Sequence, residues 1–227
     1  MLTHNFDLVF CDTDSISISK RDGAPFGPSE RASLLAELNG MMPPMLRWDD
    51  DGYYSACVVA AAKNYLLVDE AGNRKIRGSA LKATTKEKAL KEFIAFALDF
   101  LVDKNVEAVI DMYDDYAREI LSMTDISRWA SKKTVTENVL NGERTNEARI
   151  RASIKDSEYR AGDKIFTYFD ESGAVKLQEN WSGDHDVDKL LEKLFKTALV
   201  FEEIIPKQRF TNYKLKKNKL ALSALAS

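Results

Sequence analysis

Residues 10–15 read Phe10-Cys11-Asp12-Thr13-Asp14-Ser15, and they lie between two stretches that favour β-strands. The apolar run 8–10 leads into the two acids, and residues 16–19 alternate between isoleucine and serine, the period of a half-buried strand. This pattern predicts a tight hairpin with two carboxylates at or beside its turn. In an extended Asp-x-Asp triplet both acids share one side, and such a pair of hard oxygen donors suits Mg²⁺ or Mn²⁺. A plain surface turn is the competing interpretation, because aspartate is a common turn residue.

The same hexapeptide resembles Tyr-Gly-Asp-Thr-Asp-Ser, the third palm motif of family B DNA polymerases. Residues 12–15 match this motif in identity, whereas Phe10 replaces the tyrosine and Cys11 replaces the glycine. The resemblance implies that Asp12 and Asp14 are catalytic and metal-binding residues of a DNA-directed DNA polymerase. It implies further that Asp14 binds two Mg²⁺ ions, with Mn²⁺ as an alternative, and bridges to the incoming deoxynucleoside triphosphate, while Asp12 supports the site. In that reaction the primer 3′-hydroxyl attacks the α-phosphate and pyrophosphate leaves.

A second hairpin is predicted from residues 65–68 and 75–79, which flank a turn signal at residues 70–73. Ala62-Lys63-Asn64-Tyr65 resembles the Lys-Lys-Arg-Tyr element of the family, and Lys75-Ile76-Arg77-Gly78 resembles the Lys-x-Lys-Gly element that follows it. In family B polymerases these elements hold the primer-template duplex. We therefore expect the following residues to bind DNA: Lys63, Tyr65, Lys75, Arg77, Gly78 and Lys82. A basic hairpin taken alone is more often a solvated face.

Helical patterns occupy much of the remaining chain. Residues 29–38 predict a helix with Leu34, Leu35 and Leu38 at core spacing, ended by Gly40. Thr84 and Glu87 have capping-box spacing before a long apolar stripe, and a further helix is predicted from about Val106 to Leu121. The stripe is expected to bury Phe93, Phe96 and Phe100. Asp184-His185-Asp186 predicts the start of a last helix, with His185 in the capping region and not a metal ligand.

Two stretches resemble the family's thumb. Residues 127–133 mix bases, hydroxyls and Trp129 in a manner suited to phosphate contacts, and they loosely resemble the thumb's Ile-Ser-Lys-Ser-Leu. Lys132 and Lys133 are therefore predicted to bind DNA. Residues 162–168 resemble its Gly-Asp-x-Val-x-Tyr stretch. The basic run 207–219 has two open interpretations, a DNA-tracking segment or a frayed basic end.

Composition is that of a soluble globular protein, with 227 residues, 44% hydrophobic and 30% charged. There is no apolar run long enough to span a membrane and no signal-peptide pattern. Two cysteines and two histidines outside any Cys-x-x-Cys pattern make a zinc site unexpected, and reduced thiols indicate a cytosolic compartment. The net charge of −3 opposes global attraction to DNA, so a local basic groove would have to bind it.

The combined prediction is an α+β fold. Residues 1–83 would form the C-terminal part of an antiparallel palm, with the Asp-Thr-Asp hairpin and the basic primer-grip hairpin, and residues 84–227 a mostly helical thumb. The family's other catalytic-Asp motif, its fingers helix and its exonuclease domain have no counterpart in the sequence. We therefore expect the smaller half of a split polymerase, as in some phages and archaea, or a fragment of a longer one.

The expected partners follow from this resemblance. They are primer-template DNA, deoxynucleoside triphosphates and a larger polymerase chain carrying the exonuclease, the remaining palm and the fingers, with a sliding clamp as a further candidate and no membrane. The expected location is the cytoplasm of a prokaryotic or phage-infected cell, or wherever the replicated DNA lies. Two other functions stay open: a non-catalytic DNA-binding remnant of a polymerase, and a small metal-dependent nuclease that uses Asp12 and Asp14.

Overall fold

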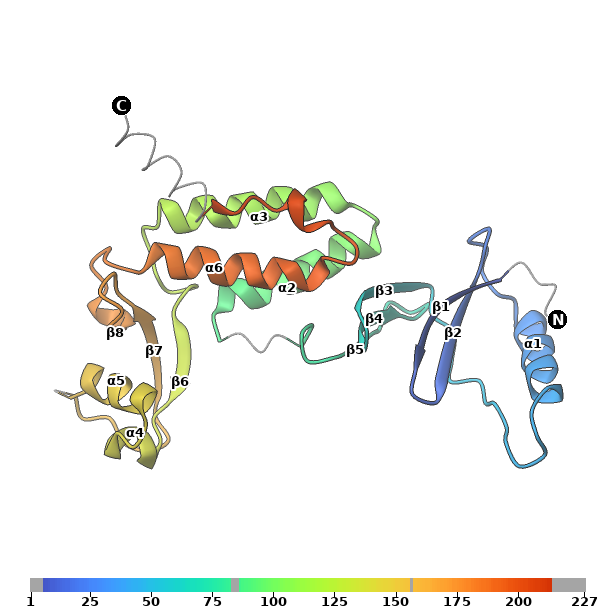
Figure 1. Cartoon of the computed structure of the whole chain (residues 1–227), viewed down its shortest axis with the longest axis horizontal. Helices are drawn as coiled ribbons and strands as arrows, with labels where there is room; N and C mark the ends of the chain where they lie inside the picture. Colours follow the sequence, from blue (N-terminus) through green and yellow to red (C-terminus); the bar gives the residue numbers. More distant parts are fainter. Residues whose placement is uncertain (1–5, 83–85, 156, 214–227) are drawn as a thin grey trace. The chain divides into compact units, whose positions relative to one another are not determined.

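The computed structural model describes residues 6–82, 86–155 and 157–213 and divides the chain into two compact units, residues Met1–Arg77 and Gly78–Ser227 (Figure 1). Within the described residues, these units contain three small antiparallel sheets and six α-helices. The predicted mixture of helices and antiparallel strands is thus confirmed. The first unit ends at Arg77, a few residues before the boundary after residue 83 that the sequence predicts.

The first unit begins with the predicted Asp-Thr-Asp hairpin. Strand β1 (Phe6–Asp12) pairs antiparallel with β2 (Ser15–Lys20), and Asp12 lies opposite Ser15 across a two-residue turn. Thr13 occupies the left-handed region at φ 55°, an unusual conformation for a β-branched residue but one that two-residue hairpin turns require. The Ser15 hydroxyl donates a hydrogen bond of 3.0 Å to the Asp12 carbonyl and closes the turn.

Helix α1 (Pro28–Gly40) follows the hairpin. The Glu30 carboxylate accepts a hydrogen bond of 2.8 Å from the Gly27 amide and thereby satisfies a free donor at the helix start. The expected core packing of this helix is wrong, because none of its residues is fully buried and its leucines are only half-buried. Apolar spacing gives a helix a stripe, but only a covering element can bury that stripe.

A three-stranded sheet completes the first unit. Its strands β3 (Ala56–Ala61), β4 (Asn64–Val68) and β5 (Arg74–Arg77) lie in sequence order and pair antiparallel. The β4–β5 hairpin is the predicted one, with Tyr65 opposite Arg77. The β3–β4 hairpin was not predicted as such. The chain turns at residues 62 and 63, where Lys63 has φ 61°. In the sequence, Lys63 and Asn64 are the polar residues that interrupt the apolar run of the two strands.

Three helices pack together in the second unit: α2 (Lys88–Val102), α3 (Val106–Leu121) and α6 (Val187–Ala198) (Figure 1). The predicted helix over residues 106–121 is confirmed. Of the three phenylalanines expected in the core, Phe93 is fully buried and Phe100 is half-buried. Phe96 is 48% exposed, so the expectation is wrong for that residue. The rest of the predicted stripe is confirmed, because Leu90, Ile94 and Leu98 are buried.

The predicted capping box at the start of α2 is also wrong. Glu87 is itself the residue that precedes the helix, and its side chain makes no capping bond. Its carboxylate turns inward to bind Lys193 and Ser131. Thr84, the other expected member of the box, lies outside the described residues.

The second unit also contains a small sheet with strand order β6 (Ser131–Thr134), β7 (Lys164–Phe169) and β8 (Val175–Leu177). Helices α4 (Glu137–Asn141) and α5 (Thr145–Ser153) lie beside it (Figure 1). A buried cluster joins these elements through Val135, Val139, Ile154, Ile165 and Leu177. Short 3₁₀ turns complete the unit at η1 (Gln178–Asn180), η2 (Leu199–Phe201) and η3 (Lys207–Arg209).

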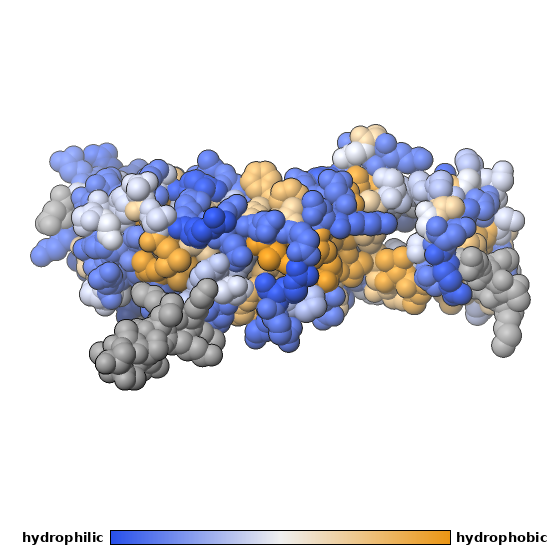
Figure 2. Space-filling view, turned by 90° about the horizontal axis from the view of Figure 1, so that it is seen from above, coloured by the Kyte–Doolittle hydropathy of each residue, from blue (hydrophilic) through white to orange (hydrophobic). Residues whose placement is uncertain are grey.

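The face of the molecule seen in Figure 2 is mostly hydrophilic, with separate hydrophobic patches. None of the described helices is long and apolar enough to cross a membrane. Both cysteines are free thiols.

Candidate active site and nucleic-acid interface

The two aspartates of the Asp-Thr-Asp hairpin lie in different surroundings. Asp12 is the last residue of β1, and its side chain is 24% exposed. Asp14 lies in the turn and is exposed, and its carboxylate makes no hydrogen bond or ion pair with any described residue. The hairpin therefore presents one supported carboxylate and one whose oxygens are available to a ligand.

Asp12 contacts the second sheet of the same unit. The Tyr65 hydroxyl on β4 donates a hydrogen bond of 3.1 Å to Asp12 Oδ2, and the Tyr65 ring lies 4.4 Å from that of Phe10. Lys63 Nζ lies 3.8 Å from Asp12 Oδ1. Residues that the sequence assigns to two separate roles, DNA binding and metal binding, are thus neighbours. No spacing signal links Tyr65 to Asp12, because 53 positions separate them.

Tyr65 is only 8% exposed. Burial raises the pKa of its phenol, and the hydrogen bond to Asp12 and the negative charge of that carboxylate raise it further. The hydroxyl therefore stays protonated at neutral pH and acts as a donor to Asp12. Its predicted contact with DNA remains a prediction.

The other basic residues of this region lie along and after β5. Lys75 Nζ lies 3.2 Å from the Tyr54 hydroxyl and 3.3 Å from Asp51 Oδ2, and these two contacts raise the pKa of Lys75. Arg77 and Lys82 are exposed, and Gly78 has φ 92°, a conformation that disfavours any residue with a side chain. Their predicted contacts with DNA also remain predictions.

Asp12 and Asp14 fit part of a site for a divalent metal ion. Two carboxylates are the hard oxygen ligands that Mg²⁺ and Mn²⁺ prefer, and Asp14 has no competing partner among the described residues. No group of three or more His, Cys, Asp or Glu side chains placed to hold a metal occurs in the described part of the chain. This hairpin alone would contribute two ligands to such a site, and a complete shell would need further donors.

Strand β6 separates the two lysines that the sequence groups together. Lys132 pairs with Phe166 and both are exposed, whereas Lys133 pairs with Ile165 and is half-buried. Successive side chains of a strand point to opposite faces, so DNA bound at one face of β6 could not contact both lysines. Burial lowers the pKa of Lys133, and the positive charges of Lys86 and Lys193 lower it further.

Two residues of the expected phosphate-contacting stretch at 127–133 instead bind carboxylates of the same unit. Arg128 forms ion pairs with Glu92 at 2.9 Å and with Glu119 at 2.7 Å. Trp129 is 1% exposed and donates from its indole nitrogen to Glu119 at 2.8 Å. The expectation is wrong for this pair, because a mixed basic and aromatic sequence does not reveal that carboxylates on α2 and α3 already bind it.

The start of α6 agrees with its prediction. Asp186 accepts a hydrogen bond of 2.9 Å from the Lys189 amide and so caps the helix. His185 beside it is 5% exposed and lies between the Trp181 indole and the Ile120 carbonyl. Of the basic run at 207–219, residues 214–219 lie outside the described residues.

No protein-family model matches this chain, and no curated protein does. Among solved structures it is similar to the family B DNA polymerase from the hyperthermophilic archaeon Pyrobaculum calidifontis, with a TM-score of 0.64 and 16% sequence identity. The match covers 88% of this chain and 27% of that polymerase. At this identity the similarity concerns the fold alone. The chain therefore shares the fold of about a quarter of a family B DNA polymerase.

Proposed function

We propose that this chain is the part of a DNA-directed DNA polymerase that carries the metal-binding Asp-Thr-Asp hairpin, the primer grip and the thumb. In this proposal it serves template-directed nucleotidyl transfer together with a partner chain. The observation that supports the proposal most directly is the contact of Asp12 with Tyr65 and Lys63. It joins the acidic hairpin to the basic one, the two elements that a polymerase needs side by side at the primer end.

The residues have distinct roles in this proposal. Asp14 offers its carboxylate to the metal ions, and Asp12 supplies a second carboxylate whose orientation Tyr65 holds. Divalent ions bound there would favour ionisation of the primer 3′-hydroxyl and neutralise charge on the triphosphate. Lys63 and Arg77 contact backbone phosphates of the duplex, which they attract without reading sequence.

The need for a partner is inferred from the surface of the first hairpin. Strand β1 has a single partner strand among the described residues, and Leu8 on it is 62% exposed and Val9 38% exposed. Unpaired strand edges and apolar side chains in water are normally covered in stable assemblies. We propose that strands of a larger partner chain cover them. The partner chain would also supply the remaining metal ligand and the fingers.

The decisive experiment is primer extension with three preparations: this chain, a larger chain recovered with it by affinity purification from its host, and their mixture. We expect synthesis only in the mixture, and none when this chain carries Asp14→Ala. Robust extension by this chain alone would contradict the need for a partner. DNA binding without extension in any mixture would favour the non-catalytic remnant, and metal-dependent cleavage of the template by this chain alone would favour the nuclease.

A further inference from the structure

The turn between β3 and β4 places the side chain of Lys63 beside Asp12. Lys63 has φ 61°, in the left-handed region, and the Asn64 side-chain amide donates a hydrogen bond of 3.0 Å to the Ala62 carbonyl. From this turn, Lys63 Nζ lies 3.8 Å from Asp12 Oδ1. Lys63 is the one cation that the described part of the chain places within ion-pair distance of Asp12.

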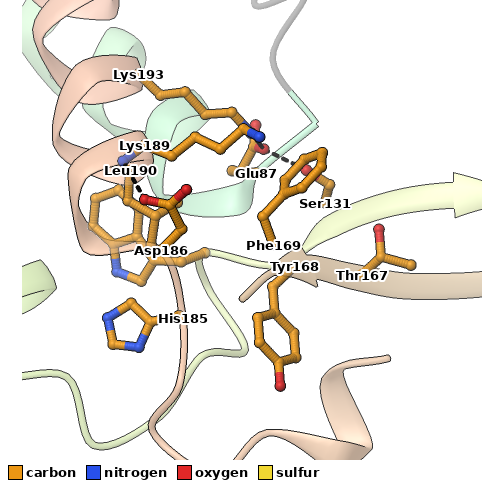
Figure 3. Close-up of a pocket in the computed structure, with 11 residues that line it drawn as sticks. Glu87, Ser131, Thr167, Tyr168, Phe169, His185, Asp186, Lys189, Leu190 and Lys193 are labelled. Atoms are coloured by element: carbon orange, nitrogen blue, oxygen red, sulfur yellow. Dashed lines mark hydrogen bonds and ion pairs between the residues drawn. The ribbon is translucent and has the colours of Figure 1, made fainter. Parts of the chain in front are cut away.

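This ion pair is loose and open to water. Its separation exceeds that of a hydrogen bond, and the Lys63 side chain is 73% exposed. The pair of Lys193 with Glu87 in the second unit is of the opposite kind, because Figure 3 shows the lysine reaching towards a carboxylate that is 4% exposed. Exposed ion pairs contribute little to stability, whereas buried ones are costly to break. Lys63 and Asp12 can therefore separate without disturbing the fold.

The carboxylate of Asp12 is also half of the candidate metal site. Its Oδ2 already accepts the hydrogen bond from Tyr65, and its Oδ1 faces the Lys63 ammonium. Carboxylate oxygens bind Mg²⁺ at about 2.1 Å, so an ion on Oδ1 would lie within a few ångströms of the ammonium. Like charges at that separation repel. Lys63 therefore opposes the binding of a divalent ion as long as its ammonium stays beside Asp12.

Lys63 has a second partner in the proposed function, a backbone phosphate of the primer-template. The ammonium is a point charge on a flexible four-carbon stem, so a phosphate can attract it without any change in the backbone of the turn. A phosphate that draws the ammonium away removes the positive charge from Asp12 and leaves Oδ1 open to an ion.

We propose that Lys63 is an internal counter-ion of Asp12 that couples metal binding to primer-template binding. The chain binds a divalent ion weakly while the ammonium lies beside Asp12, and more tightly once a DNA phosphate engages the ammonium. Coupling between two ligands is reciprocal, so the ion raises the affinity for primer-template by the same factor. This inference rests on the proposed function, because it takes the metal ion and the primer-template as the two ligands.

The first test is a titration of the full chain with Mn²⁺, followed by electron paramagnetic resonance without DNA. Lys63→Gln should raise the affinity for Mn²⁺ about fivefold, the upper range for loss of one exposed ion pair. Lys63→Arg keeps the positive charge and should keep the affinity low. The matched control is Arg77→Gln, which removes the same charge from an exposed residue of the same sheet that lies opposite Tyr65. Its affinity should stay within about twofold of the unchanged chain.

The second test measures the coupling itself. A primer-template duplex should raise the Mn²⁺ affinity of the unchanged chain, after subtraction of the ions that the duplex binds alone. In Lys63→Gln this rise should be about fivefold smaller, because no ammonium remains to be drawn away. Arg77→Gln should need more DNA to reach saturation and then show the full rise.

The outcomes separate this inference from the function on which it rests. If Asp14→Ala leaves all Mn²⁺ binding unchanged, the hairpin holds no ion, and both the proposed function and the coupling are wrong. If Asp14→Ala removes a bound Mn²⁺ but Lys63→Gln behaves like the unchanged chain, the coupling alone is overturned. An equal gain in affinity for Arg77→Gln would also overturn the assignment to Lys63. Thermal unfolding of Lys63→Gln should match the unchanged chain, and a marked loss would indicate a structural role instead.

Discussion

Asp12 and Asp14 are separated by a single residue in the motif but differ in what surrounds them. Asp12 receives a hydrogen bond from Tyr65 and lies near Lys63, whereas Asp14 is exposed and has no partner among the described residues. A carboxylate already engaged by a donor is held in one orientation, and an unengaged one can bind a cation without first breaking a contact. This difference predicts unequal effects of removing the two carboxylates.

In the assembled enzyme, Asp14→Ala should abolish nucleotide incorporation while primer-template binding stays nearly intact. Loss of a direct metal ligand removes charge stabilisation of the transition state, for which we expect about 4 kcal/mol, roughly a thousandfold in rate. Asp12→Ala should be damaging but less so. Single-turnover incorporation measures both effects, and near-normal rates in Asp14→Ala would refute its assignment as a ligand.

Tyr65→Phe tests the support of Asp12. The change removes the hydrogen bond but keeps the ring that packs against Phe10, so unfolding free energy should fall by about 1 kcal/mol. In an Asp12→Ala, Tyr65→Phe cycle the two losses should be less than additive, because each change removes the one contact that the residues share. Urea denaturation supplies the values, and full additivity would mean that the two side chains do not interact.

At the scale of elements, the β3–β4 and β4–β5 hairpins determine where the basic residues lie. The turn at residues 62 and 63 brings Lys63 to Asp12, while pairing within the sheet sets Arg77 opposite Tyr65. One three-stranded sheet thus links the predicted primer grip to the predicted metal site.

Simultaneous replacement of Lys63, Tyr65 and Arg77 should weaken primer-template affinity regardless of DNA sequence. Loss of the two cations should reduce the log–log salt slope by about 0.9 for each phosphate contact, and Tyr65 should act through packing. A salt titration of DNA binding decides the matter. If the slope does not change, the hairpin simply faces solvent.

The contact between the start of α2 and α6 predicts a dependence of stability on pH. Burial alone would raise the pKa of Glu87, but its hydrogen bond and ion pair with Lys193 and its bond with Ser131 hold that pKa below the ordinary value of 4.5. A carboxyl with a lowered pKa stabilises the fold above its unfolded pKa, and this contribution is lost as pH falls through the folded value.

Glu87→Gln should therefore cost about 2 kcal/mol of unfolding free energy at pH 7, because Lys193 loses its buried partner. The difference from the unchanged chain should shrink as pH falls below 4.5. Urea denaturation at several pH values tests this expectation. Glu107→Gln is the control, since its pair with Arg209 is exposed and should matter little. A difference for Glu87→Gln that does not vary with pH would contradict the role of the charge.

For the whole molecule, the exposed apolar residues of β1 predict a dependence on another chain. If strands of a partner cover Leu8 and Val9, then Leu8→Ser, Val9→Ser should weaken association roughly tenfold or more. Met45→Ser is a control at a residue that is 93% exposed and lies outside the hairpin. Calorimetry with the copurified chain measures both affinities, and equal values would place the interface elsewhere.

The sequence by itself determined the elements whose conformation depends on residues close together along the chain. Alternation at residues 16–19 predicted β2, the turn signal at residues 70–73 predicted the β4–β5 hairpin, and helical spacing predicted α3 from Val106 to Leu121. The motif at residues 10–15 named the two acids. Each of these depends on backbone geometry and side-chain period over a few residues.

Only the tertiary structure decided which residues far apart in the sequence come into contact. It buries Trp129, exposes Phe96, turns Glu87 away from its helix towards Lys193, and joins Tyr65 to Asp12. The same sequence pattern permits either outcome, because spacing specifies which side chains share a face and not which element covers that face. Burial and ion pairing depend on the element opposite, and only the folded arrangement of strands and helices supplies it.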